Sequence, residues 1–124
     1  MKPTDWSIPD KPFDLRERLF LFGCVIIRVV QYLHTQGPIA VALSYQILKS
    51  GTSAGSNYEE ADSGSSPRDT LAKRKIVLRE LKETSFRLRL LRHTGYLGEE
   101  HDPVLQENTE LARIVATIIR KSER

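Results

Sequence analysis

The sequence predicts an all-α protein, built as an antiparallel up-down-up-down four-helix bundle. Four segments carry apolar residues at helical spacing, and each has start or stop signals of its own. No segment shows sustained strand alternation or a hairpin dipeptide. The chain has 124 residues, enough for one hydrophobic core but not for two. We therefore expect an extended N-terminal arm at residues 1–13 and a single four-helix-bundle domain at residues 14–122.

The first helix is predicted from Leu15 to about Thr35, with Asp14 as N-cap and Glu17 three positions later. Its apolar run, residues 19–33, is too short to cross a bilayer and lacks the flanks of a signal peptide. A helix that is apolar nearly all round needs cover on more than one side. Because the chain is small, we expect a neighbouring subunit to cover part of this helix.

The single cysteine, Cys24, lies inside this apolar run and is predicted to be a small core residue. One cysteine excludes an intramolecular disulfide and a multi-cysteine zinc site. A thiol-poor chain of this kind favours a cytoplasmic location.

Proline and capping residues mark the starts of the other three helices. The second begins at Pro38, although residues beyond Lys49 favour a loop by local propensity. The third runs from Pro67 to about Thr94 and is capped by Gly95. The fourth is predicted to begin at Pro103, with Asp102 as its N-cap, and to end at Lys121.

Residues 50–61, SGTSAGSNYEEA, resemble the S-G-T-S-x-G-x-N-Y-x-E-A signature of a bacterial four-helix-bundle family. That family includes proteins encoded in intervening sequences of 23S ribosomal RNA genes, and the accessory proteins of diversity-generating retroelements are similar in build. FDLRER at residues 13–18 and LRELKETSFRLRLL at residues 78–91 extend the resemblance to about residues 13–121. The signature residues that we expect to pack the helices are Ser50, Gly51, Thr52, Gly55, Asn57, Tyr58, Glu60, Ala61, Glu80, Glu83 and Thr84.

The resemblance implies that the second helix continues through the Ser/Gly-rich segment, against its local propensity. Gly51 and Gly55 would then lie on one helix face, where small residues let another helix approach closely and hydroxyl groups bond across the contact. Glycine in a helix interior costs about 1 kcal/mol relative to alanine, and packing at this contact would offset that cost for each of the two glycines. The resemblance also implies a ring-like homopentamer, with RNA or DNA and a reverse-transcriptase-like or other protein as partners.

Two groups of residues are candidates for catalysis or metal binding. Glu80 and Glu83 are paired carboxylates, but Glu83 and Arg87 are spaced as an i,i+4 ion pair, which favours a structural role. The acids and histidines around the last turn have no fixed metal-ligand spacing. We expect no enzymatic activity, no metal and no cofactor. The residues of that turn are His93, Glu99, Glu100, His101 and Asp102.

The charge of the chain is concentrated on the third helix. Residues 67–94 hold nine basic and three acidic residues, a net charge of +6, so the rest of the +3 chain sums to −3. At about 100° per residue, six of the cations share an arc of about 140°. We predict these six as a nucleic-acid-binding face: Arg74, Lys75, Arg79, Lys82, Arg89 and Arg92.

Two interpretations of this face stay open. The first is binding to the phosphates of a nucleic acid, most plausibly structured RNA, read by backbone and shape because no aromatic pattern is interleaved with the cations. The second is a scaffold or adaptor for protein–protein assembly with no nucleic-acid role. In that case the cations would pair with acids of neighbouring helices or subunits: Glu59, Glu60, Asp62, Glu107 and Glu110.

Overall fold

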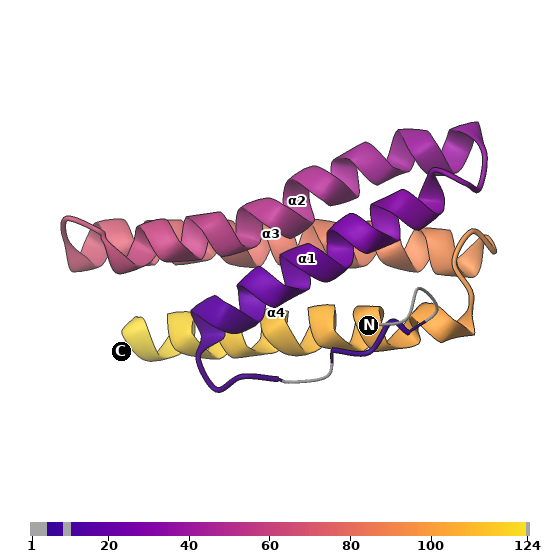
Figure 1. The fold of residues 1–124 in the computed structure, drawn as a ribbon. Coiled ribbons are helices and arrows are strands. Elements are labelled where there is room, and N and C mark those ends of the chain that lie inside the picture. The colour runs from indigo at the N-terminus through magenta and orange to yellow at the C-terminus, as the bar shows by residue number, and fades with distance from the viewer. Residues whose placement is uncertain (1–4, 9–10, 124) are drawn as a thin grey trace.

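The computed structural model describes residues 5–8 and 11–123, and these residues form an antiparallel four-helix bundle (Figure 1). The all-α, up-down prediction is confirmed, and no strand occurs in the described part of the chain. The elements are α1 (Leu15–Leu33), α2 (Pro38–Asp62), α3 (Pro67–His93), a 3-10 turn η1 (Glu99–His101) and α4 (Asp102–Ser122).

Local signals place most helix ends where the sequence predicts them. The Asp14 carboxylate accepts a hydrogen bond from the Arg16 backbone N–H at 3.0 Å, and the Ser66 hydroxyl accepts one from the Asp69 N–H at 3.1 Å. Both bonds satisfy N–H groups that have no partner within the helix. After α3, Gly95 takes a φ of +89°, a conformation that favours glycine.

The start of α4 differs from the prediction. Asp102 is the first residue of the helix rather than its N-cap, because η1 leads directly into α4. The Asp102 carboxylate instead accepts hydrogen bonds from the Arg92 guanidinium, at 2.9 and 3.5 Å. An ion pair between helices has thus replaced the expected cap.

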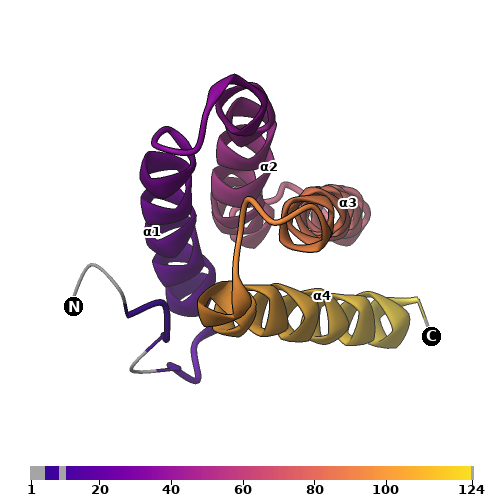
Figure 2. The same cartoon turned by 90° about the vertical axis from the view of Figure 1, so that its right-hand side faces the viewer.

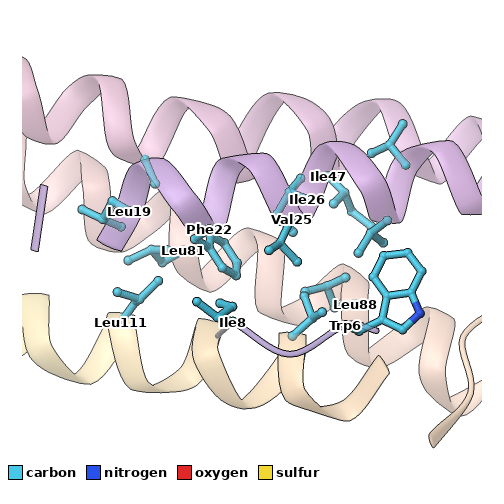
Figure 3. Packing of buried hydrophobic residues seen from close by; sticks show 14 of the residues in the cluster. Trp6, Ile8, Leu19, Phe22, Val25, Ile26, Ile47, Leu81, Leu88 and Leu111 are labelled. Atoms are coloured by element: carbon cyan, nitrogen blue, oxygen red, sulfur yellow. The ribbon is translucent and has the colours of Figure 1, made fainter. Parts of the chain in front are cut away.

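The helices surround one apolar interior, with α1 and α3 on opposite sides of α2 in the end-on view (Figure 2). Figure 3 shows how side chains from all four helices meet there. Phe22 and Ile26 of α1, Ile47 of α2, Leu88 of α3 and other core residues are fully buried. None of the helices in the described part of the chain is long and apolar enough to span a bilayer.

Part of the N-terminal arm belongs to this core. Residues 1–4 and 9–10 lie outside the described residues, but Trp6 and Ile8 are buried against the bundle (Figure 3). The Trp6 ring packs on Tyr32 and His101, at centroid distances of 5.9 and 4.7 Å. The arm therefore supplies some of the cover for α1 that a neighbouring subunit was expected to supply.

Helix α2 runs unbroken through the Ser/Gly-rich segment, as the resemblance implied. A Cβ atom built on Gly51 would lie 2.9 Å from two side-chain carbons of Ile26, and one on Gly55 would lie 3.5 Å from the Leu19 carbonyl oxygen. Helix α1 thus packs directly on the glycine face. The side chains of Thr52 and Asn57 donate to backbone carbonyls four residues earlier, so these polar groups are satisfied within the helix.

Candidate nucleic-acid interface

Four of the six predicted cations form an exposed face on α3, hereafter the basic face: Lys75, Arg79, Lys82 and Arg89. Lys75 makes an ion pair with Glu123 at 3.4 Å, and Arg79 makes one with its neighbour Glu80 at 3.7 Å. Lys82 and Arg89 make no ion pair with any residue that the structure describes. The face therefore carries positive charge that the described residues of the chain do not neutralise.

The other two predicted cations lie at the border of the basic face. Arg92 is held by Asp102 of α4, and this hydrogen bond raises the pKa of the Arg92 guanidinium. Arg74 is half-buried, and its Nε is buried without a hydrogen-bond partner in the described structure. Neither side chain is as free to reach an external ligand as those of the basic face.

Within the chain, the acids that were expected to neutralise the cations mostly bind elsewhere. Glu107 and Glu110 accept the Arg18 guanidinium, with Nη2 at 2.7 and 2.9 Å from their nearest oxygens. Glu60 pairs with Lys73, which lies on the other side of α3, and Asp62 pairs with Arg16. The pairing of the basic face with Glu107 or Glu110 is therefore not made inside the chain.

Phe86 lies in the middle of the basic face. Its side chain is 54% exposed and lines a shallow groove of about 480 Å³ with Lys75, Arg79 and Lys82. The Arg89 guanidinium lies 5.8 Å from the centre of the ring. The expectation that no aromatic pattern is interleaved with the cations overlooks this one exposed ring. The helical period itself places Phe86 between Lys75 and Arg79 around α3, so the signal was present in the sequence.

A second exposed surface lies on α1, and it includes Cys24. Phe20 and Ile27 are 59% and 45% exposed, and they line a groove of about 320 Å³ between α1 and α2 together with Cys24 and Gly55. The prediction of Cys24 as a core residue was wrong. Residues 19, 22, 26 and 29 take the inward face of α1, and the helical period turns residue 24 outward.

The turn before α4 is built around a buried histidine. The His101 Nδ1 accepts a hydrogen bond from the Gly98 N–H at 3.0 Å, and its ring packs at a tilt against both Trp6 and Tyr32, with centroid distances of 4.7 Å. Burial lowers the pKa of His101. Among the described residues, no three histidine, cysteine or acidic side chains are grouped so that they could hold a metal ion.

The sequence matches the family described as 23S rRNA-intervening sequence protein over residues 15–117. The chain belongs to this family. A crystal structure of a protein with unknown function from the S23 ribosomal protein family of Bacteroides thetaiotaomicron VPI-5482 is similar, with 29% sequence identity and a TM-score of 0.79. That similarity covers 86% of this chain and 98% of the other. No curated protein sequence matches the chain.

In this member of the 23S rRNA-intervening sequence protein family, several signature residues meet where α2 packs on α3. The hydroxyl groups of Ser50 and Thr84 are both buried and share a hydrogen bond of 2.6 Å. Tyr58 is buried, and burial raises the pKa of its hydroxyl. The Ala61 carbonyl accepts a hydrogen bond from Thr70 at the start of α3. The Ser50–Thr84 and Thr70–Ala61 hydrogen bonds hold the two helices together.

The two candidate catalytic carboxylates, Glu80 and Glu83, each lie next to an arginine. Glu83 pairs with Arg87 at 3.9 Å, as the i,i+4 spacing predicted, and Arg87 also donates to Gln46 of α2 at 2.5 Å. Glu80 pairs with Arg79. Both carboxylates thus make ion pairs with residues of α3 in this family member, Glu83 at an exposed position and Glu80 at a partly buried one.

Proposed function

We propose that this member of the 23S rRNA-intervening sequence protein family binds nucleic acid, in the first place structured RNA, through the basic face of α3. The observation that carries the proposal is the exposure of four cations on one helix, two of them without an ion pair in the described structure. From residue 75 to residue 89, a helix spans roughly 21 Å, long enough to follow several phosphates of one strand. A cytoplasmic location fits the free thiol of Cys24.

The expected source of affinity is release of the counterions that surround the phosphates. If all four cations neutralise a phosphate, the logarithm of the binding constant falls with the logarithm of salt concentration, with a slope of roughly −3 to −4. Contacts of this kind carry little sequence information, so binding by the cations alone depends on backbone and shape.

Lys82→Glu is expected to weaken RNA binding about tenfold or more at low salt and to reduce the salt slope by about 1 or more. The reason is that Lys82 lies at the centre of the basic face and is exposed. The measurement is a salt-titrated fluorescence anisotropy assay with a labelled structured RNA. Lys73→Glu changes the charge equally on the opposite side of the same helix and should leave binding nearly unchanged. Absent or salt-insensitive binding by the wild type would overturn the proposal, as would equal losses in both variants.

We also propose that the chain forms a homo-oligomer through the apolar surface of α1. Phe20, Cys24 and Ile27 are exposed together beside a groove, although they belong to the most apolar run of the chain. The resemblance implied a pentamer, and a ring would repeat the basic face and raise a weak affinity by avidity. An oligomer that binds no nucleic acid would favour the scaffold or adaptor function instead.

Phe20→Lys is expected to convert the oligomer to a monomer, because a charge would be placed where the surface is apolar. Light scattering coupled to size-exclusion chromatography measures this directly. Ile39→Lys is the matched control, since Ile39 has the same 59% exposure on another helix. A wild-type protein that is monomeric at micromolar concentration would contradict the expectation.

A further inference from the structure

We propose that Phe86 is a stacking platform for an unpaired nucleobase, so that the preferred ligand is an RNA with a loop, bulge or single-stranded segment rather than a uniform duplex. This inference rests on the proposed nucleic-acid binding by α3. It adds which feature of the RNA is recognised, namely an unpaired base.

The position of Phe86 carries the first step of the argument. A phenylalanine ring that is 54% exposed loses much of the benefit of burial, and the Arg89 guanidinium lies 5.8 Å from the centre of the ring. The ring also lines the same groove as Lys75, Arg79 and Lys82. The groove is also lined by the Glu83–Arg87 ion pair, so Phe86 is an exposed apolar ring on a surface whose net charge is positive.

The chemistry of the surroundings indicates the occupant. An apolar surface of a partner protein would have to bury Phe86 together with cations that need opposite charges. A nucleotide meets both requirements at once, since its base stacks on the ring while its phosphates meet the cations. Arg89 near the ring adds a cation to the stack, as is common in single-strand binding.

The base must be unpaired for a geometric reason. Bases within a duplex are stacked on each other, and the major groove of A-form RNA is too narrow and deep for side chains to reach into. A helix lying along such a duplex contacts phosphates and 2′-hydroxyl groups, and Phe86 would remain without a stacking partner. An unstacked base in a loop or bulge offers an open π-face.

The test compares two RNAs of equal length and charge, a perfectly paired hairpin and one with a bulge of unpaired nucleotides. Phe86→Ala is expected to weaken binding to the bulged RNA by roughly 5- to 150-fold and to leave binding to the paired hairpin unchanged. Leu90→Ala is the matched control, because Leu90 is also exposed and lies about one turn further along α3. It should change neither affinity.

Phe86→Trp supplies a second readout. Its indole fluorescence should be quenched by the bulged RNA and not by the paired hairpin, with the wild type, whose single tryptophan is Trp6, as the reference. Equal effects of Phe86→Ala on both RNAs would overturn the inference, as would no effect on either. A change in oligomeric state on Phe86→Ala would also overturn it, by placing the ring between copies of the chain.

Failure of the proposed nucleic-acid binding gives a different result from failure of the stacking inference. In that case neither RNA binds the wild type at low salt, and the inference about Phe86 falls with it. If both RNAs bind with a steep salt dependence and Lys82→Glu weakens both, while Phe86→Ala weakens neither, the basic face binds nucleic acid and only the stacking platform is wrong.

Discussion

Replacing Arg18 by methionine is expected to lower the free energy of unfolding by about 3–5 kcal/mol. Arg18 is buried between α1 and α4, and its Nε and Nη2 donate to the two Glu107 oxygens at 2.8 and 2.7 Å. Without the guanidinium, Glu107 is a carboxylate with 1% exposure, and Lys11 at 3.7 Å is its only remaining cation among the described residues. An uncompensated buried charge is among the most costly defects in a folded protein.

Chemical denaturation of three proteins tests this expectation. Arg18→Met should be the least stable, and Arg18→Met combined with Glu107→Leu should recover much of the loss, since an apolar pair avoids the desolvation of a lone charge. A single variant within about 1 kcal/mol of the wild type would contradict the expected role of the pair. A double variant no more stable than the single one would do the same.

Low pH is expected to destabilise the protein through the same cluster of Arg18, Glu107 and Glu110. The hydrogen bond from Arg18 lowers the pKa of Glu110 below its ordinary value of 4.5. The ionised Glu110 carboxylate therefore contributes its full stabilisation above pH 4.5, the ordinary pKa that applies to the unfolded chain. This stabilisation is lost as the pH falls through the lower pKa of Glu110 in the folded protein. In Arg18→Met this part of the acid dependence should be weaker.

Gly51→Ala is expected to lower the free energy of unfolding by about 1–3 kcal/mol, although alanine is the better helix former. The new methyl group would lie 2.9 Å from Cγ1 and Cγ2 of Ile26, which is fully buried and branched at Cβ, so it has no free end that can swing away. Helices α1 and α2 would have to move apart at this close contact.

Gly55→Ala is the matched control one turn further along α2. Its methyl group would meet the Leu19 carbonyl oxygen at 3.5 Å, an ordinary contact, so the gain in helix propensity should raise stability by up to about 1 kcal/mol. The two substitutions make the same chemical change in the same helix, and thermal or denaturant unfolding should show opposite signs. Equal effects would mean that the close approach at Gly51 does not limit the packing.

Local signals in the sequence were sufficient for the ends of most helices. The caps at Asp14 and Ser66 and the turn at Gly95 depend on neighbouring residues only, so the sequence predicts them directly. The course of α2 through the Ser/Gly-rich segment depends on contact with α1, which propensity does not contain. For that segment the family resemblance provided what local physics could not.

Contacts between distant segments explain where the prediction failed. Asp102 is not an N-cap because η1 leads directly into α4, and its carboxylate binds Arg92 of α3 instead. Nothing near Trp6 in the sequence indicates that it packs on His101. Cys24 was placed in the core because the run around it is apolar, but hydropathy alone does not separate a core face from an exposed apolar face.

The basic face was predicted as far as helical spacing can predict a surface. The period of α3 correctly groups Lys75, Arg79, Lys82 and Arg89 as exposed neighbours. It does not reveal that Arg92 is paired with another helix, since that depends on tertiary structure. The same helical period also predicts Phe86 between these cations, but it was applied to the charged residues only and therefore missed the ring.

The N-terminal arm also bears on the order in which the chain folds. Contacts between α1 and α2, α2 and α3, and α3 and α4 dominate the bundle, and each closes a short loop. The hydrogen bond from Lys11 to Glu110 joins positions 99 residues apart, so it closes a loop that contains most of the chain. The entropy lost in closing a loop rises with its length, and this contact forms at little cost only after the three hairpins have brought both ends together. We therefore expect the arm to dock last, after the four helices have assembled.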